Sequence, residues 1–214
     1  MQWQQRLWRV LTQPSGSQWL VCGLLLLLMT WLELGGDTMR LQLRYEAPLV
    51  DNGEWYRLLT GHFVHLGINH LVLNLAGIVL FFYLFIKTIS VVEIMLTVLV
   101  YALAISLALH ASGSIYWYVG FSGVLYGLFV YGVIRDPKAT LAAKWLMVIL
   151  IIAKVLYDLL LGGDPTLAEF TGGSVISQAH LYGIVMALTH SAMCWLYGHK
   201  INSKNNTHKG YSHD

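Results

Sequence analysis

The sequence predicts an all-α membrane protein, a bundle of six transmembrane helices whose short fourth helix begins inside the membrane. The composition is the first reason, because 57% of the residues are hydrophobic and only 11% are charged, which is more apolar than soluble domains reach. The second reason is the spacing of apolar stretches, near 18–34, 66–86, 91–110, 122–134, 141–161 and 177–197. All but the fourth are long enough to cross a hydrocarbon core of about 30 Å. Lipid offers the backbone no hydrogen-bond partner, so each stretch is predicted to be helical.

The chain is predicted to consist of a membrane domain between two tails. Residues 1–17 are expected to form a cytoplasmic N-terminal tail, 18–197 the membrane domain, and 198–214 a polar, disordered cytoplasmic tail. The first apolar stretch is interpreted as an uncleaved anchor, because no small-residue cleavage site follows it. The orientation follows from the basic residues, which concentrate on the cytoplasmic side of membrane proteins. This topology places Arg6, Arg9, Lys87, Arg135, Lys138, Lys144, Lys200, Lys204 and Lys209 inside, and Arg40, Arg44 and Arg57 outside. The net charge of +2 gives no indication of a nucleic-acid partner.

The fourth apolar stretch is the most informative segment. It runs from Ser122 to Ile134, 13 residues that reach only about 20 Å as a helix. The polar residues 135–138 fix its far end at one membrane surface. Ser122 is therefore expected about 10 Å below the opposite surface, at the start of a helix. A hydroxyl flanked by glycines at that depth is placed for chemistry inside the membrane.

Two irregular segments are expected on the outer side. Residues 35–65 form the longest loop, which suits an element at the membrane interface. Residues 110–120 must dip into the membrane to deliver Ser122. Non-helical backbone at that depth is tolerated only where it is buried in protein or lines a wet cavity. A water-accessible pocket open to the outer side is therefore predicted.

His180 is the candidate base for a serine nucleophile. It lies a few residues into the last apolar stretch, which runs from outside to inside, so its depth matches that of Ser122. Tyr126, one helical turn beyond Ser122, is expected to pack against the imidazole and limit its rotamers. A serine or a histidine alone is commonly a packing residue in membrane helices. The two residues at matched depth indicate catalysis.

Stripes of small residues are expected to bring the two helices together. Gly123 and Gly127 lie four residues apart on the fourth stretch, and Ala179, Gly183 and Ala187 follow the same spacing on the sixth. Such stripes permit close approach of helix backbones in lipid.

Oxyanion donors are also present at helical spacing. His70 and Asn74 are four residues apart, on one face of the second stretch near its outer end. The amide of Ser122, at the positive end of a helix dipole, is a further candidate donor. The alternative for Asn74 is a hydrogen bond that only ties two helices together.

These motifs together resemble the signature set of the rhomboid intramembrane serine proteases. They are Thr60-Gly61-His62-Phe63-Val64-His65, His70-xxx-Asn74, Gly120-Phe121-Ser122-Gly123 with Tyr126, and Ala179-His180-xx-Gly183. The resemblance covers about residues 55–190, and the motifs occur in the family's order. One departure is the family's Trp-Arg pair in the first loop, which is Tyr56-Arg57 here, so the arginine anchor carries over and the role of the tryptophan stays open.

The resemblance implies a Ser–His dyad with no acidic third member, in which Ser122 is the nucleophile and His180 the base. It also implies oxyanion stabilisation by His70, Asn74 and the Ser122 amide, and no cofactor or metal. The residues expected to support the site by packing are Gly120, Gly123, Tyr126, Gly127, Gly183 and Arg57.

The compact chain and the Thr-Gly-His-Phe-x-His-Leu-Gly lead into the second helix resemble the rhombosortase branch in particular. That resemblance implies a bacterial inner-membrane enzyme with its active site open to the periplasm. The implied partners are transmembrane substrates that carry a C-terminal Gly-Gly, a transmembrane segment and a basic tail.

Other readings of the same residues compete with this one. A non-catalytic rhomboid-like factor that binds helices would not need both the serine and the histidine. A small transporter or proton relay would use His70, His180 and His190. A Ser–Lys dyad would use Lys154, but Asp158 four residues later predicts a charged pair that makes the lysine a poor base.

Metal and haem sites are weaker interpretations. His62, His65 and His70 have no HExxH motif and no acidic partner among them. His180 and His190 are ten residues apart and are expected on different helix faces, which argues against a shared haem.

Overall fold

The structure is a computed structural model, and it describes residues 16–209, without the side chains of 198–209. The predicted N-terminal tail lies outside the described residues, apart from its last residues, which already belong to the first helix. At the other end the last helix continues to Lys209, so the backbone of most of the predicted polar tail is helical. Residues 210–214 lie outside the described residues.

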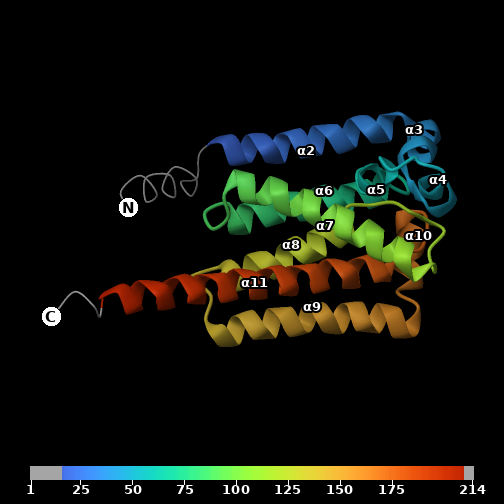
Figure 1. Ribbon diagram of the computed structural model, residues 1–214. Coiled ribbons are helices and arrows are strands. Elements are labelled where there is room, and N and C mark those ends of the chain that lie inside the picture. The colour runs from blue at the N-terminus through green and yellow to red at the C-terminus, as the bar shows by residue number, and fades with distance from the viewer. Residues whose placement is uncertain (1–15, 210–214) are drawn as a thin grey trace.

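Long helices lie side by side along one direction and form a bundle (Figure 1). They are α2 (Gly16–Leu34), α6 (Ile68–Phe85), α7 (Val91–Ser112), α8 (Ser122–Arg135), α9 (Leu141–Leu161) and α11 (Ser177–Lys209). The short elements gather at the end of the bundle that lies away from the termini (Figure 1). They are α3 (Gly36–Leu43), β1 (Tyr45–Glu46), α4 (Ala47–Asp51), α5 (Arg57–Thr60), β2 (Trp117–Tyr118) and α10 (Pro165–Thr171).

Length and apolarity qualify α2, α6 and α7 as membrane spans. The pair of α9 and α10 qualifies only together, although the chain bends by 93° between the two helices. The sequence predicts six spans, and these criteria support three or four. Part of the difference has local causes, because α8 is only 14 residues long and α9 carries Lys144, Lys154 and Asp158; α11 also does not qualify.

Capping residues explain several helix boundaries. The Ser90 side chain accepts a hydrogen bond from the Glu93 amide and begins α7. Gly162 and Gly163 have φ values of +82° and +77°, a region that favours glycine, and they produce the bend after α9. The Asp164 side chain then caps α10. The sequence reading did not anticipate this bend or α10.

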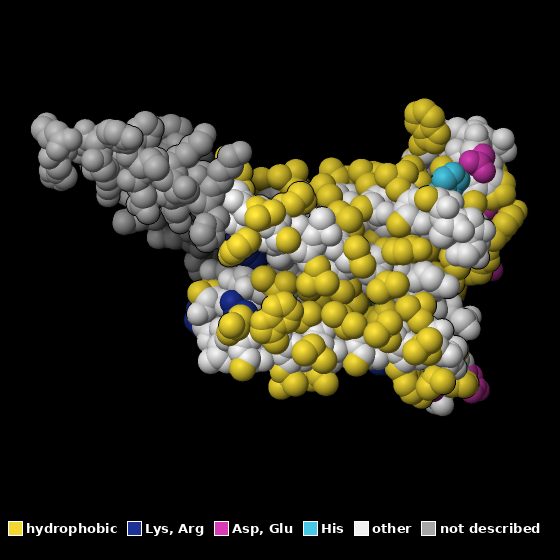
Figure 2. All heavy atoms as spheres, turned by 60° about the horizontal axis from the view of Figure 1, so that its bottom comes forward, with side chains coloured by type: hydrophobic (Ala, Val, Ile, Leu, Met, Phe, Trp, Pro, Cys, Tyr) yellow, Lys and Arg dark blue, Asp and Glu magenta, His cyan; other side chains and the backbone are white. Residues whose placement is uncertain are grey.

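The surface of the bundle is apolar over the face that α9 contributes to (Figure 2). Large exposed side chains on α9 are Leu141, Trp145, Leu146, Met147, Ile149, Leu150, Leu156, Tyr157, Leu160 and Leu161. In this view Lys and Arg side chains gather towards the end nearest the termini, and acidic and His side chains lie at the opposite end (Figure 2). An apolar belt between polar ends is the surface that a bilayer requires.

Helix α8 is the centre of the bundle. It packs against α6, α7, α9 and, most extensively, α11. Val124 and Val130 are completely buried, and most of its other residues are buried too. A short helix surrounded in this way can begin below the surface, because neighbouring helices cover the backbone that precedes it.

Candidate active site

Ser122 is the first residue of α8, and its hydroxyl meets the imidazole of His180 on α11. The distance from Ser122 Oγ to His180 Nε2 is 2.8 Å. The serine is half-buried, whereas His180 is only 4% exposed. The hydroxyl and the ring that the sequence pairs are thus in hydrogen-bond contact, in the geometry that a nucleophile and its general base need.

The imidazole of His180 is held by stacking. The ring of Tyr126 lies against it, with ring centroids 4.3 Å apart and an angle of 18° between the planes. Tyr126 follows Ser122 by one turn of α8, so one helix supplies both the hydroxyl and the ring that fixes the imidazole. His180 Nδ1 is buried and has no hydrogen-bond partner among the described residues.

The glycines of α8 and α11 make this contact possible. A Cβ added at Gly123 would lie 2.9 Å from the carbonyl oxygen of Ala179, and one at Gly127 would lie 2.7 Å from that of Gly183. A Cβ at Gly183 would in turn collide with the carbonyl oxygen of Gly123. Any side chain in this seam would therefore push α8 and α11 apart and separate Ser122 from His180.

Gly120 shapes the turn that leads into Ser122. Its φ of +112° favours glycine, and an added Cβ would lie 2.6 Å from His70 Cε1. The Gly120 amide donates to the Gly61 carbonyl at 3.0 Å, and the Tyr118 hydroxyl donates to the Gly120 carbonyl at 2.5 Å. The turn is thus fixed on both sides and brings its backbone against the ring of His70.

His70 and Asn74 lie on one face of α6 and are only 3% and 2% exposed. The Leu66 amide donates to His70 Nδ1 at 3.4 Å, so in the neutral ring the proton is on Nε2. That Nε2 is buried and has no hydrogen-bond partner in the described part of the chain, and it lies on the side of Gly120. The Asn74 amide donates to the His70 carbonyl at 2.9 Å. The first amides of α8 add donors, because a helix start leaves them without intrahelical partners.

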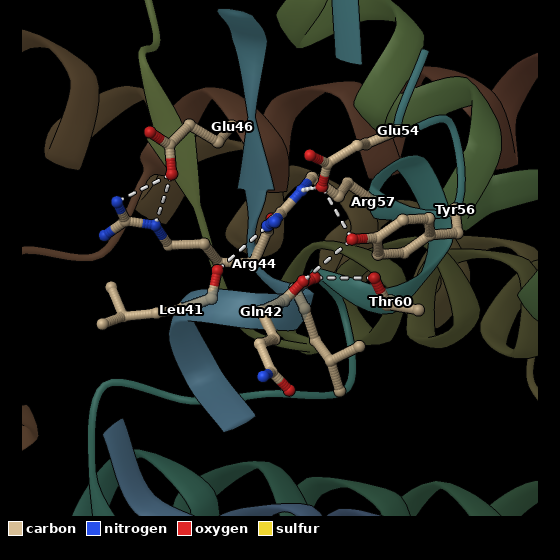
Figure 3. Close-up of polar contacts among 9 residues, drawn as sticks. Leu41, Gln42, Arg44, Glu46, Glu54, Tyr56, Arg57 and Thr60 are labelled. Atoms are coloured by element: carbon tan, nitrogen blue, oxygen red, sulfur yellow. Dashed lines mark hydrogen bonds and ion pairs between the residues drawn. The ribbon is translucent and has the colours of Figure 1, made fainter. Parts of the chain in front are cut away.

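Arg57 organises the segment outside the bundle (Figure 3). It is 5% exposed, and its guanidinium donates to the carbonyls of Leu41 at 3.0 Å and Arg44 at 2.8 Å. Its Nε also donates to Glu54 at 2.7 Å. Hydrogen bonds from Tyr56 and then from Arg57 lower the pKa of Glu54. Arg57 therefore joins α5 to the end of α3 and to Arg44, the residue just before β1, and these segments form one unit.

A small sheet connects that unit to the loop before Ser122. β1 pairs antiparallel with β2, with Tyr45 opposite Tyr118. Sequence reasoning missed Tyr118, which is 1% exposed and supports Gly120 through its hydroxyl. The only signal was its aromatic, strand-favouring character in a segment otherwise rich in Gly and Ser.

The residues on which the alternative hypotheses rest, Lys154 and His190, bind other partners. Lys154 Nζ binds both carboxylate oxygens of Asp158 at 2.6 Å, whereas Ser122 binds His180. His190 binds the Tyr101 hydroxyl at 3.2 Å.

The histidines in and just before α6 also have separate contacts. His62 Nε2 contacts the Ser106 hydroxyl at 2.9 Å, and the rings of His65 and His70 meet edge to face. Among the described side chains, those of residues 16–197, no group of three or more His, Cys, Asp or Glu is arranged to hold a metal ion.

Comparison with known protein families identifies the family of this chain. The family model described as the Rhomboid domain matches residues 52–197, which is more than half of the chain. No curated protein sequence matches it. The matched range contains α5 to α10 and the part of α11 up to Tyr197, and with them Ser122, His180, His70 and Asn74. The match and the apolar helices together show that the chain is a multi-pass membrane protein. The chain belongs to the rhomboid family, whose members are generally intramembrane serine proteases.

Proposed function

We propose that this chain is an intramembrane serine endopeptidase, which hydrolyses a peptide bond near the outer end of a substrate transmembrane segment. The observation that carries the proposal is the contact of 2.8 Å between Ser122 Oγ and His180 Nε2 at the start of a short, buried helix. No ordinary packing role requires a serine hydroxyl, a stacked imidazole and a glycine seam at one point.

Catalysis proceeds through an acyl-enzyme. Ser122 Oγ attacks the carbonyl carbon of the scissile bond while His180 Nε2 takes the hydroxyl proton. The C–N bond then breaks, and His180 returns that proton to the leaving amine. Water attacks the resulting ester with His180 again as base, which releases the new carboxyl terminus and regenerates Ser122.

The oxyanion of each tetrahedral intermediate is stabilised by His70 Nε2–H, by the Asn74 amide and by the backbone N–H of Ser122. The support is that His70 has an unpartnered buried Nε2 beside the turn and that Ser122 begins a helix. Loss of one such donor lowers the rate by about 100- to 1000-fold.

All of the long helices cross the bilayer in this proposal, which gives six spans with both termini in the cytoplasm. The basic side chains near the end that carries the termini support that orientation (Figure 2). The opposite end, with the Arg57 unit, then faces the periplasm of a bacterial inner membrane. A pocket of about 240 Å³ opens there, between the loop that leads into α8 and residues 174–176.

The substrates are membrane proteins with a C-terminal Gly-Gly, a transmembrane segment and a basic tail. The pocket has no charged side chain in its lining, which is formed by Leu66, Ser114, Ile115, Tyr116, Trp117, Tyr118, Val119, Ser174, Val175 and Ile176. Such a lining suits a small, uncharged peptide segment beside the dyad, since neither Ser122 nor His180 belongs to the lining itself. Glycines also help a substrate helix to unwind and expose its peptide bond.

The direct experiment compares wild type with Ser122→Ala in proteoliposomes that contain a Gly-Gly-tailed transmembrane substrate. We expect wild type to release the tail and to react with a fluorophosphonate probe at Ser122, and the variant to do neither. Ser112→Ala, at an exposed serine on the end of α7, is the matched control and should keep both activities. Unchanged cleavage by Ser122→Ala would show that the chain does not use this dyad, and absence of labelling in wild type would favour a helix-binding factor.

A further inference from the structure

The pair of Lys154 and Asp158 on α9 is not used by the proposed mechanism. Lys154 Nζ lies 2.6 Å from each carboxylate oxygen of Asp158. The two side chains differ in exposure, at 48% for the lysine and 5% for the aspartate. The carboxylate therefore points into the bundle and the ammonium lies at its surface.

Asp158 faces the helices that carry the dyad. α9 packs against α8 and α11, and the only buried residues of α9 are Val148, Val155 and Asp158. Asp158 also lines a cavity of about 20 Å³ together with Ser177, in the first turn of α11 and one turn before His180. A buried carboxylate thus lies at the same end of α11 as the proposed base.

The groups that act electrostatically on His180 come from α9 and α6. They are Asp158, His70 and Lys154. Lys154 and Asp158 also act on Tyr126 of α8, whose ring stacks on His180.

The dyad by itself leaves a positive charge without a counter-ion. When His180 Nε2 takes the serine proton, an imidazolium forms at a site that is 4% exposed and has no partner on Nδ1. A buried cation is destabilised unless an opposite charge lies nearby. Coulomb attraction acts over several ångströms in a medium of low dielectric constant, so direct contact is not required.

We propose that Asp158 is a positioning residue of the active site, whose buried carboxylate stabilises the imidazolium form of His180 from α9. This inference rests on the proposed function. Lys154 has the complementary role of keeping the carboxylate ionised inside the membrane while the dyad is at rest. The pair acts as an oriented dipole with its negative end towards the imidazole, and it contacts no substrate atom.

The test measures kcat and KM against pH for cleavage of a tailed transmembrane substrate in proteoliposomes. Asp158→Asn should lower kcat by about 10- to 100-fold, less than the roughly 10⁴-fold that follows loss of an aspartate hydrogen-bonded directly to the base. KM should stay within about 2-fold, because Asp158 does not touch the substrate. The acid limb of the kcat profile should move to lower pH, because a negative charge near the imidazole has been removed.

A double variant separates this role from simple charge balance within the pair. Asp158→Asn leaves Lys154 unpaired, so Lys154→Met combined with Asp158→Asn removes both charges. The double variant should be as slow as Asp158→Asn and show the same shifted acid limb. Recovery of the wild-type rate by the double variant would overturn the proposal, since it would show that the pair only balances charge.

Asp164→Asn is the matched control. Asp164 lines the same cavity and caps α10, a role that Asn also fills, and it is not among the groups that act on His180. It should leave kcat and the profile unchanged. If Asp158→Asn kept the wild-type kcat and acid limb, the role of Asp158 would be overturned. The proposed function would still stand as long as Ser122→Ala abolished cleavage. Cleavage that survives Ser122→Ala would remove both.

Discussion

Two histidines of α11 stack in the same way on tyrosine rings, but they differ in burial and in the partner of the ring nitrogen. His180 stacks on Tyr126 with ring centroids 4.3 Å apart, and His190 stacks on Tyr131 with centroids 4.4 Å apart. Both tyrosines belong to α8. The histidine–tyrosine stack is therefore a packing unit that occurs at both places along the seam, and the stack alone does not make a reactive site.

The two histidines differ in the hydrogen-bond partner of the ring nitrogen. His180 Nε2 contacts the hydroxyl of Ser122 at a helix start, whereas His190 Nδ1 contacts the phenol of Tyr101. The Tyr131 hydroxyl donates to Glu93, and Arg135 pairs with the same carboxylate at 3.5 Å. The second stack is thus part of a polar network that ties α7, α8 and α11 together, and its histidine is half-buried.

The largest expected effect separates the two histidines directly. His180→Ala should lower kcat by about 10³- to 10⁴-fold, because the serine loses its base. His190→Ala should keep kcat within a few-fold of wild type and reduce only stability. Both are checked by substrate cleavage in proteoliposomes and by thermal unfolding in detergent. Equal losses of kcat in the two variants would mean that the comparison is wrong.

The seam that brings both stacks together should be sensitive to a single methyl group. Gly183→Ala places a Cβ against the Gly123 carbonyl, so we expect a loss of about 1–3 kcal/mol in stability and a strong loss of fluorophosphonate labelling. Gly23→Ala on α2, where nothing lies within 4 Å of the added Cβ, is the control and should remain within about 1 kcal/mol of wild type. Labelling at the wild-type rate in Gly183→Ala would show that the close approach is not needed.

Removing the hydroxyl of Tyr131 or of Tyr126 should have a smaller effect, and the two variants should differ in stability. Tyr131→Phe keeps the stack and removes the hydrogen bond to Glu93, and a hydrogen bond to a charged group contributes about 1.5–3 kcal/mol. Stability should fall by an amount in that range while kcat is retained. Tyr126→Phe keeps the ring on His180 and should change kcat by less than about 3-fold. Denaturant or thermal unfolding followed alongside cleavage distinguishes the two, and a greater activity loss in Tyr131→Phe would contradict the assignment.

The smallest effect is expected outside both stacks, at Glu54. The hydrogen bonds from Tyr56 and Arg57 lower its pKa, so the folded state binds its proton less readily than the unfolded chain. The resulting stabilisation is fully present above the ordinary glutamate pKa of about 4.3 and is lost as the pH falls through the lowered value. Melting temperatures measured from pH 6 to pH 3 should show a decline that Glu54→Gln flattens. An identical decline in the variant would place the acid sensitivity elsewhere.

Much of the site follows from local sequence rules. The shortness of α8, the expected depth of Ser122 and the small-residue spacing are each read from a single segment, and they suffice to predict the pairing of Ser122 with His180. His180 and His190 were expected on different faces of their helix, and yet both meet α8. The reason is that α8 packs extensively along α11, so a broad face of α11 is in contact with it.

The remainder depends on long-range pairing that no local pattern encodes. The partners of Arg57 are backbone carbonyls of residues 41 and 44, which any sequence would supply. The pairing of Tyr45 with Tyr118 joins segments more than 70 residues apart. The inward direction of Asp158 likewise depends on the orientation of α9 about its own axis in the bundle. The helical period alone does not determine that orientation.

The turn at Gly120 limits which amino-acid substitutions the chain tolerates at that position. Every amino-acid substitution there adds a Cβ at a position where the ring of His70 leaves no space and where φ is +112°. Gly53 has a similar φ of +98° but nothing within 4 Å of an added Cβ. In a saturation library selected for proteolysis, codon 120 should return glycine alone, whereas codon 53 should also return asparagine.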